Sequence, residues 1–199
     1  MIISLIFTTK IQKICIMDLI FTTSNESKIK STQLVLDKYN IRVIGEKIEV
    51  DEIQSRDPEK VILDKVRRSY EIVRKPLISM DSGLFIEPLN EFPGVYTRPV
   101  LETIGEDGLM KLTKEMEKPR AYVQRMIAYT DGEITQIFSS RGYGEIIQEK
   151  RGDNGWDYDK IFYVKEKNKT LAEMTDKEKV AVWGDAWDKL GQWLNNKYN

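Results

Sequence analysis

The stretch Pro76-Leu77-Ile78-Ser79-Met80-Asp81-Ser82-Gly83-Leu84 is followed shortly afterwards by Pro93-Gly94-Val95-Tyr96. Its apolar first part is typical of a buried strand, and Asp-Ser-Gly is ordinary turn chemistry. This order predicts that the strand ends at Met80, that the chain reverses after Asp81, and that the Asp81 carboxylate points into a cleft. A carboxylate there suits metal binding or activation of a water molecule. The structural alternative is an aspartate that only initiates a turn.

Strands and helices are expected to alternate on both sides of this stretch. Apolar and β-branched runs predict strands at 19–23, 41–44, 47–50, 77–80, 122–130, 134–147 and 161–164. Helical patterns and capping residues predict helices at 26–39, 57–74, 101–117 and 177–195. Asp131-Gly132 is a strong hairpin signal, and Arg141-Gly142-Tyr143-Gly144 is expected to form a flexible bend. The order of elements predicts a mixed α/β sheet with a cleft.

The composition excludes several classes of site. The chain of 199 residues fits one domain, and a net charge of −1 provides no basic field that would recruit nucleic acid. The chain has no histidine, which excludes Ser-His-Asp and Cys-His catalysis and His-ligated zinc. Carboxylates and lysines remain, and these permit a Mg²⁺ site made of carboxylate and phosphate oxygens. The lone cysteine, Cys15, excludes an internal disulfide framework and predicts a cytoplasmic protein.

Residues 1–16 differ from the rest of the chain. They are apolar but interrupted by Lys10 and Lys13, and they are too short to span a membrane. Leu5-Ile6-Phe7-Thr8-Thr9 is repeated as Leu19-Ile20-Phe21-Thr22-Thr23, with Met17 just before the second copy. We therefore expect 1–16 to be an extension outside the functional protein and 17–199 to be a single domain.

Further motifs follow in a recognisable order: Thr23–Lys28, Asp51–Gln54, Lys65, Asn154–Phe162 and Glu173–Lys179. Together with the Asp81 stretch, they resemble the Ham1-like nucleoside-triphosphate pyrophosphatases, from about Asp18 to Leu194. The resemblance implies an elongated mixed sheet flanked by helices, with two lobes and a central substrate cleft. It also implies hydrolysis of non-canonical or modified purine nucleoside triphosphates to the monophosphate and pyrophosphate by a homodimer. No membrane and no nucleic acid is expected as a partner.

The strand, Thr23-Ser24-Asn25 and the following helix form a natural phosphate cradle. Free amides at a helix N-terminus attract anions, Ser24 and Asn25 add side-chain donors, and Lys28 can neutralise a phosphate oxygen. An ordinary helix cap is the structural alternative.

The resemblance assigns catalysis to Asp81 and Lys65 and metal binding to Glu52 and Asp81. Glu52 is expected at a strand end, where the neighbouring Asp51 would face solvent. Lys65 could instead belong to a solvated basic helix face. The resembling enzymes have two adjacent acids where this chain has Met80 and Asp81, so one carboxylate is missing. Water is expected to attack the α-phosphorus with Mg²⁺ bound, while Lys28, Lys65 and Lys179 hold the phosphates and Ser82 contacts the substrate.

For the nucleobase, the resemblance places Trp156 as the stacking partner. Tyr158 supports it or packs in the core, and Asp159 accepts hydrogen bonds from the base. The family motif Ser-His-Arg, which reads the 6-keto group, is absent: the chain continues after Lys179 as Val180-Ala181-Val182-Trp183-Gly184-Asp185. Asp185 accepts hydrogen bonds but does not donate them, which predicts a shift away from keto purines. A packed helix with Asp185 as a solvated cap is the alternative.

Two other functions remain open at this point. A relative of the Maf-type pyrophosphatases would prefer pyrimidine or modified nucleotides. A catalytically weakened nucleotide-binding protein would fit Met80 and the missing Ser-His-Arg. Turnover distinguishes an enzyme from a binding protein.

Overall fold

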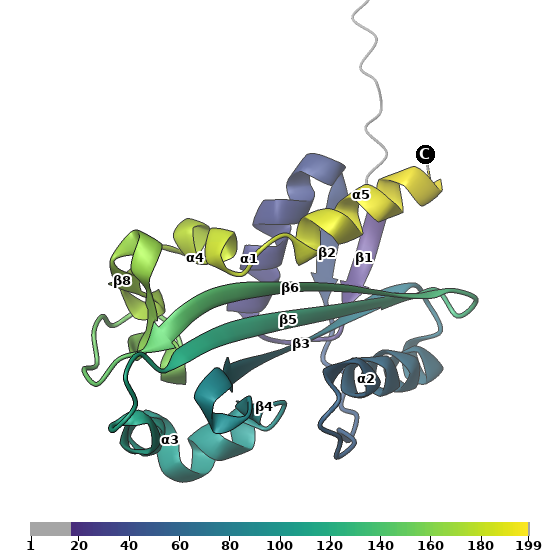
Figure 1. Ribbon diagram of the computed structural model, residues 1–199. Helices are drawn as coiled ribbons and strands as arrows, with labels where there is room; N and C mark the ends of the chain where they lie inside the picture. The colour runs from purple at the N-terminus through teal and green to yellow at the C-terminus, as the bar shows by residue number, and fades with distance from the viewer. Residues whose placement is uncertain (1–16, 199) are drawn as a thin grey trace, which may run out of the picture.

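The computed structural model describes residues 17–198, which form a single sheet covered by helices (Figure 1). The predicted extension 1–16 lies outside the described residues. The strands are β1 (Met17–Phe21), β2 (Ile41–Gly45), β3 (Leu77–Ile86), β4 (Phe92–Gly94), β5 (Arg120–Thr130), β6 (Thr135–Ile146), β7 (Phe162–Val164) and β8 (Lys169–Thr170). The α-helices are α1 (Glu26–Leu36), α2 (Pro58–Val73), α3 (Thr97–Thr113), α4 (Asp176–Val182) and α5 (Ala186–Tyr198). Short 3-10 turns fill several connections, including Asp157–Lys160.

The eight strands run in the order β2-β1-β3-β5-β6-β7-β8, with β4 paired to β3. β1 is parallel to β2 and to β3, whereas the other pairs are antiparallel. This confirms the predicted mixed α/β sheet.

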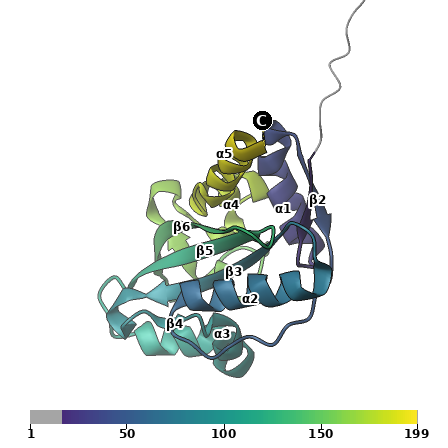
Figure 2. The ribbon, with the colours of Figure 1, turned by 90° about the vertical axis from the view of Figure 1, so that its right-hand side faces the viewer.

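Hydrophobic clusters divide the molecule into two ends joined by the long strands. At the β1–β2 end, α1 and α5 cover one face of the sheet and α2 covers the other (Figures 1 and 2). At the other end, a second core gathers residues of β3, β5, β7 and α3. β5 and β6 run across the whole molecule between these ends. The predicted two-lobed arrangement follows from these separate cores.

Local sequence signals for helix starts and turns are confirmed. The side chain of Asn25 accepts a hydrogen bond from the Lys28 amide (3.1 Å) and caps α1. Asp57 caps α2 in the same way, with Pro58 in its first turn. The Asp131 side chain accepts from the Ile134 amide (2.8 Å) and closes the β5–β6 hairpin. No helix within the described range is long and apolar enough to cross a membrane.

The predicted strand end at Asp81 is wrong, because β3 continues to Ile86. β5 pairs with β3 along its full length, from Leu77 opposite Thr130 to Ile86 opposite Ala121. This continuous ladder holds Asp81-Ser82-Gly83 in an extended conformation. Tertiary pairing therefore overrides the local turn propensity of these residues.

Two further predictions about strands are also wrong. Lys47–Val50 lies in an irregular segment after β2 rather than in a strand. Arg141–Gly144 is not a bend but part of β6, paired with β5. The glycines are needed there for close approach, since a Cβ on Gly142 would collide with the Val182 carbonyl oxygen and one on Gly144 would lie 2.5 Å from the Tyr163 oxygen.

The helix predicted at 177–195 is two helices, α4 and α5. They are separated at Gly184, whose φ of +75° lies in the left-handed region that ends helices. The helix predicted at 101–117 begins earlier, at Thr97, and is kinked at Gly105 (φ +62°). The break at Gly184 places Trp183 and Asp185 in a connection rather than inside a helix.

Candidate active site

The candidate site lies where one edge of β3 is left open. β1 pairs with β3 only as far as Ile78, and β4 pairs with it only from Leu84 onward. Within residues 17–198, no strand pairs with this edge between Ser79 and Gly83. The Asp81 stretch and the Pro93-Gly94-Val95-Tyr96 motif meet beside this gap, because Gly94 is the register partner of Leu84. The Thr97 hydroxyl donates a hydrogen bond to the Gly94 oxygen (2.6 Å) and holds this pairing in place. The gap leaves the edge of β3 at Asp81 without a neighbouring strand.

Asp81 lies on the sheet face that α2 covers. Its register partner on β5 is Met126, which packs with Ile62 and Val66 of α2. Burial raises the pKa of Asp81, the charge of Lys65 opposes this rise, and the nearby carboxylate of Glu52 adds to it. Asp81 therefore has a partly buried carboxyl group with basic and acidic neighbours from distant parts of the chain.

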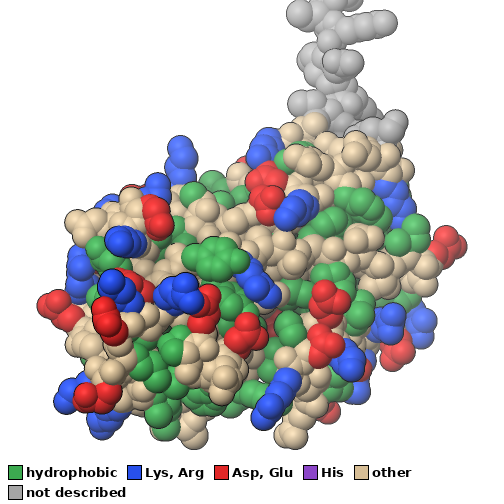
Figure 3. All heavy atoms as spheres, viewed as in Figure 1, with side chains coloured by type: hydrophobic (Ala, Val, Ile, Leu, Met, Phe, Trp, Pro, Cys, Tyr) green, Lys and Arg blue, Asp and Glu red, His purple; other side chains and the backbone are tan. Residues whose placement is uncertain are grey.

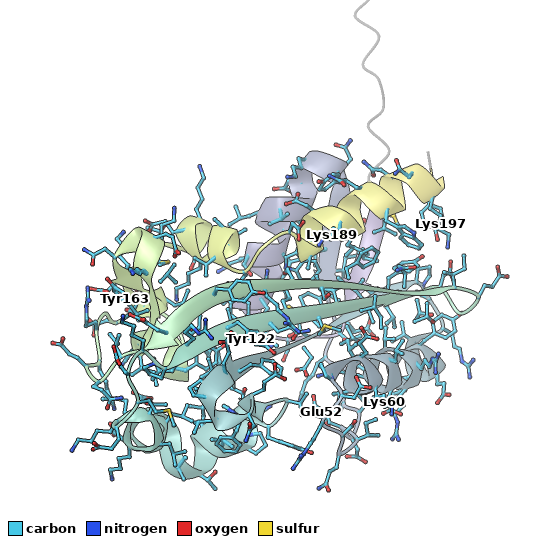
Figure 4. All side chains as sticks on the ribbon, in the orientation of Figure 1. Glu52, Lys60, Tyr122, Tyr163, Lys189 and Lys197 are labelled. Atoms are coloured by element: carbon cyan, nitrogen blue, oxygen red, sulfur yellow. The ribbon has the colours of Figure 1, made fainter. Side chains whose placement is uncertain are left out.

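Glu52 reaches the site from a loop rather than from the predicted strand end. Figure 4 shows it beneath the sheet, near α2. Its carboxylate accepts a hydrogen bond from the Lys65 ammonium (2.6 Å). The Lys65 side chain is largely buried, so the alternative of a solvated basic face does not describe it. Asp51 is exposed, as expected.

Lys28 approaches the same cluster from the first turn of α1. Desolvation lowers its pKa, the charge of Lys65 lowers it further, and Asp81 acts in the opposite direction. The side chain is nevertheless exposed, so its ammonium is accessible from solvent. The helix that carries it is capped by Asn25, and the Thr23 hydroxyl accepts from the Asn25 amide (3.2 Å), while Ser24 is exposed. The capping alternative is thus confirmed for Asn25, and Lys28 remains the cation nearest to Asp81 on this helix.

Met80 and Ser82 lie on the opposite face of the sheet from Asp81, because side chains alternate along a strand. Met80 packs against the hydrophobic cluster beneath α1 and α5. Ser82 is the register partner of Arg125. The missing family carboxylate is therefore replaced by an apolar contact, and Asp81 is the acid that this motif retains.

The segment predicted to bind the base has one exposed and two buried side chains. Trp156 is 63% exposed, whereas Tyr158 is buried in the second core. Asp159 is also buried and accepts hydrogen bonds from the Lys179 ammonium (2.9 Å) and from the Trp156 amide (3.2 Å). Asp159 thus joins the 3-10 turn to α4, and Trp156 is presented to solvent beside this ion pair.

Asp185 is not brought into this group. It is exposed, and it pairs with Lys189 (2.8 Å) one turn along α5. A shallow hollow beside β6 is lined by Asp185, Lys189, Ser139 and Arg141. This placement matches the alternative of a solvated residue at the start of a helix.

Two arginines near the site had no motif that singled them out. Arg98, in the first turn of α3, pairs with Glu102 (2.8 Å), and its charge also acts on Glu52 and Lys28. Arg125 is buried in the middle of β5, and its charge also acts on Lys28. The only sequence feature that could have pointed to Arg98 as a site residue is its position at the start of a helix. An arginine amid an otherwise apolar strand was the signal for Arg125.

The acidic residues of the site fit a cation that arrives with phosphate. Among the residues that the structure describes, no group of three or more Cys, His, Asp or Glu side chains could hold a metal ion. Asp81 and Glu52 supply two carboxylates that both interact with the charge of Lys65. Mg²⁺ is commonly held by one or two carboxylates together with substrate phosphates. The pair is therefore suited to a divalent metal that substrate oxygens help to coordinate.

Acidic and basic side chains are interspersed over the face shown in Figure 3, and no large basic patch covers it. Phosphate binding at this site would therefore depend on a few local cations, of which Lys28 and Lys65 are the nearest to Asp81.

Comparison with known proteins shows the family to which this chain is related. The model of the Ham1 family matches residues 19–193. A dITP/XTP pyrophosphatase of Pyrococcus horikoshii is 40% identical, over 92% of this chain and all of that protein. A dITP/XTP pyrophosphatase of Thermococcus kodakarensis is 36% identical, over 89% of this chain and 97% of that protein.

Solved structures show the same fold. A HAM1 protein from Coxiella burnetii superposes with a TM-score of 0.79 at 27% identity, covering 91% of this chain and all of that chain. The Ham1 protein of Staphylococcus aureus gives a TM-score of 0.75 at 26% identity, covering 90% of this chain and 99% of that chain. Sequence and fold agree over nearly the whole length, and the chain belongs to the Ham1 family.

Proposed function

We propose that this protein hydrolyses nucleoside triphosphates to the nucleoside monophosphate and pyrophosphate. The observation that carries this function is the partly buried Asp81 carboxyl group, which interacts electrostatically with Lys65, Glu52 and Lys28 at the open stretch of β3. Relatives at 31–40% identity named dITP/XTP pyrophosphatases support the same reaction. A substrate with three phosphates matches a site that gathers cations around one carboxylate.

Lys28 and Lys65 would bind the phosphate oxygens and orient the α-phosphorus. Asp81 would accept the proton of the attacking water, and its raised pKa makes it a stronger base than an exposed aspartate. The water oxygen forms a bond to the α-phosphorus. The bond between the α-phosphorus and the oxygen that bridges it to the β-phosphorus breaks, and pyrophosphate leaves with that oxygen. Ser82, from the other face of β3, and the amides of α1 that the Asn25 cap does not occupy would also contact the substrate.

We expect Mg²⁺ to be the metal, held by Glu52 and Asp81. When bound, the ion would offset negative charge on the phosphates. Glu52, which accepts a hydrogen bond from Lys65 (2.6 Å), and Asp81 are the residues that would hold it, and Lys65 would contact the phosphates beside them.

The test is release of pyrophosphate and monophosphate from a panel of inosine, xanthosine, adenosine and cytidine triphosphates, with and without Mg²⁺. Metal-dependent release supports the proposal. Nucleotide binding without release would favour the catalytically weakened binding protein. A preference for cytidine triphosphate would favour a Maf-like specificity. The homodimer and the cytoplasmic location remain predictions.

Removal of the Trp156 ring should weaken nucleotide binding without loss of stability. Base–aromatic stacking contributes about 1–3 kcal/mol, so KM should rise about 5-fold to 150-fold in Trp156→Ala. A side chain that is 63% exposed contributes little to folding, and Tm should change by no more than a few degrees. Trp156→Phe, which keeps an aromatic face, is the matched control and should restore most of the binding. An unchanged KM in Trp156→Ala would contradict the stacking role.

A further inference from the structure

Arg125 is a buried cation with unused hydrogen-bond donors. It lies in the middle of β5 and is 7% exposed. Its Nε and Nη1 atoms are buried and have no hydrogen-bond partner in residues 17–198. Burying donors without acceptors costs about 1–3 kcal/mol each, so such groups need an explanation. An acceptor that binds there with the substrate would provide one.

The neighbours of Arg125 are aromatic rings, which stabilise the charge but accept no N–H bond in the guanidinium plane. The guanidinium carbon lies 4.9 Å from the Trp183 ring centroid and 5.9 Å from that of Trp187. Burial lowers the pKa of Arg125 to about 10, so the group is still a cation at neutral pH. Its donors therefore remain available for an acceptor in the plane of the guanidinium.

The position of Arg125 joins the phosphate side of the site to the base side. On β5 it is opposite Ser82, which follows Asp81, and its charge acts on Lys28. It also interacts electrostatically with Tyr158 of the segment expected to bind the base. Trp183, which covers it, belongs to the segment that replaces the family's Ser-His-Arg.

We propose that Arg125 is a specificity-determining residue that donates hydrogen bonds to the carbonyl oxygen of a 6-keto purine. The inference rests on the proposed function. A keto purine presents acceptors at O6 and N7, a pattern that arginine reads well, whereas adenine presents an amino donor in place of O6. Arg125 thus supplies from β5 the donors that the C-terminal segment lacks. This reverses the expectation of a shift away from keto purines, which depended on Asp185.

The Trp183 side chain that covers Arg125 is held less firmly than the backbone that carries it. Trp183 is only partly buried, whereas its carbonyl oxygen accepts a hydrogen bond from the Ser140 hydroxyl (2.6 Å). Val180 and Val182 of the preceding helix pack against the hydrophobic cores. Displacement of the Trp183 side chain, with its backbone in place, would expose the guanidinium donors to the base.

The experiment compares inosine and adenosine triphosphates, which differ at the 6-position, in wild type, Arg125→Met and Arg125→Lys. In Arg125→Met, kcat/KM for inosine triphosphate should fall about 5-fold to 150-fold, and that for adenosine triphosphate should stay the same or rise. Arg125→Lys keeps the charge but has fewer donors, so its kcat/KM for inosine triphosphate should lie between those of wild type and Arg125→Met. The Tm of Arg125→Met should be equal to or above that of wild type, because a buried cation with unpaired donors is removed.

Arg141→Met is the matched control. Arg141 lies on the neighbouring strand with its guanidinium 4.4 Å from the Tyr122 ring centroid, but it is exposed. Its substitution should leave the ratio of the two substrates unchanged. Equal losses for both substrates in Arg125→Met would overturn the specificity role.

Dissociation constants of both triphosphates, measured by calorimetry without Mg²⁺, separate this proposal from the reaction itself. Absence of turnover in wild type, with a ratio of dissociation constants that still depends on Arg125, would overturn the proposed hydrolysis and support the role of Arg125. Normal turnover, with a ratio of dissociation constants that does not change when Arg125 is replaced, would support the proposed hydrolysis and overturn the role of Arg125.

Discussion

Replacement of Asp81 by asparagine should lower kcat for pyrophosphate release about 100-fold to 10,000-fold. Asparagine has nearly the same shape, but it neither accepts the proton of the attacking water nor binds a metal ion as a carboxylate does. Wild type and Asp81→Asn should be compared at saturating substrate and Mg²⁺. Asp51→Asn, which changes an exposed acid in the neighbouring loop, is the control and should retain full activity. Activity of Asp81→Asn within a few-fold of wild type would rule out Asp81 as the base.

Asp81→Asn should also be at least as stable as wild type at neutral pH. Burial raises the pKa of Asp81 above that of the unfolded chain. The contribution of Asp81 to the free energy of unfolding is therefore fully present below the pKa that Asp81 has in the unfolded chain. It is lost as pH rises through the pKa that Asp81 has in the folded protein. At neutral pH the carboxylate is charged and partly desolvated, and its replacement removes that cost. Urea unfolding at several pH values measures this, and stability of wild type relative to the variant should fall as pH rises.

The same raised pKa should appear in the activity. The acidic limb of the kcat/KM profile of wild type should lie at a higher pH than the ordinary aspartate range, because protonation of Asp81 removes the base.

Replacement of Trp187 by alanine should destabilise the fold by about 3–5 kcal/mol. Trp187 is 2% exposed, and its ring meets that of Phe21 edge-on with centroids 5.6 Å apart. Its removal leaves a cavity between α5 and the β1–β2 end of the sheet, and it also removes one aromatic neighbour of Arg125. Equilibrium unfolding in urea gives the free energy of unfolding directly.

Trp156→Ala is the matched comparison, since it deletes the same ring from an exposed position. Its free energy of unfolding should lie within about 0.5 kcal/mol of wild type. Equal losses in the two variants would mean that burial does not determine the cost, in conflict with the core described above.

Local sequence chemistry accounts for the parts of the fold that were predicted correctly. The cap at Asp57 and the hairpin residue Asp131 act on neighbours within a few positions, so their effect can be read without knowing the fold. The end of β3 could not be read in this way. Asp81-Ser82-Gly83 stays extended because β5, far along the chain, pairs with it. Likewise, the break between α4 and α5 depends on Gly184 packing against Ser140 of β6.

The residues of the candidate site also differ in whether local sequence could identify them. The resemblance selected Glu52, Lys65, Lys28 and Asp81, and the structure brings their charges together. Asp185 was selected from an ungapped position after Lys179, and it lies elsewhere because the chain turns at Gly184. Arg125 was missed because one arginine in a largely apolar strand matches no motif. The structure shows that Trp183, in the connection between α4 and α5, and Trp187 of α5 lie against its guanidinium.

The open stretch of β3 also bears on the solubility of the protein. An unpaired strand edge is a template for addition of another chain, and long flat edges promote aggregation. Here the edge between Ser79 and Gly83 is bounded by β1 at one end and β4 at the other. The unpaired edge is short, and it contains the charged side chain of Asp81. Both features oppose addition of a strand from another chain. The edge beside Asp81 is thereby protected against addition of another polypeptide strand.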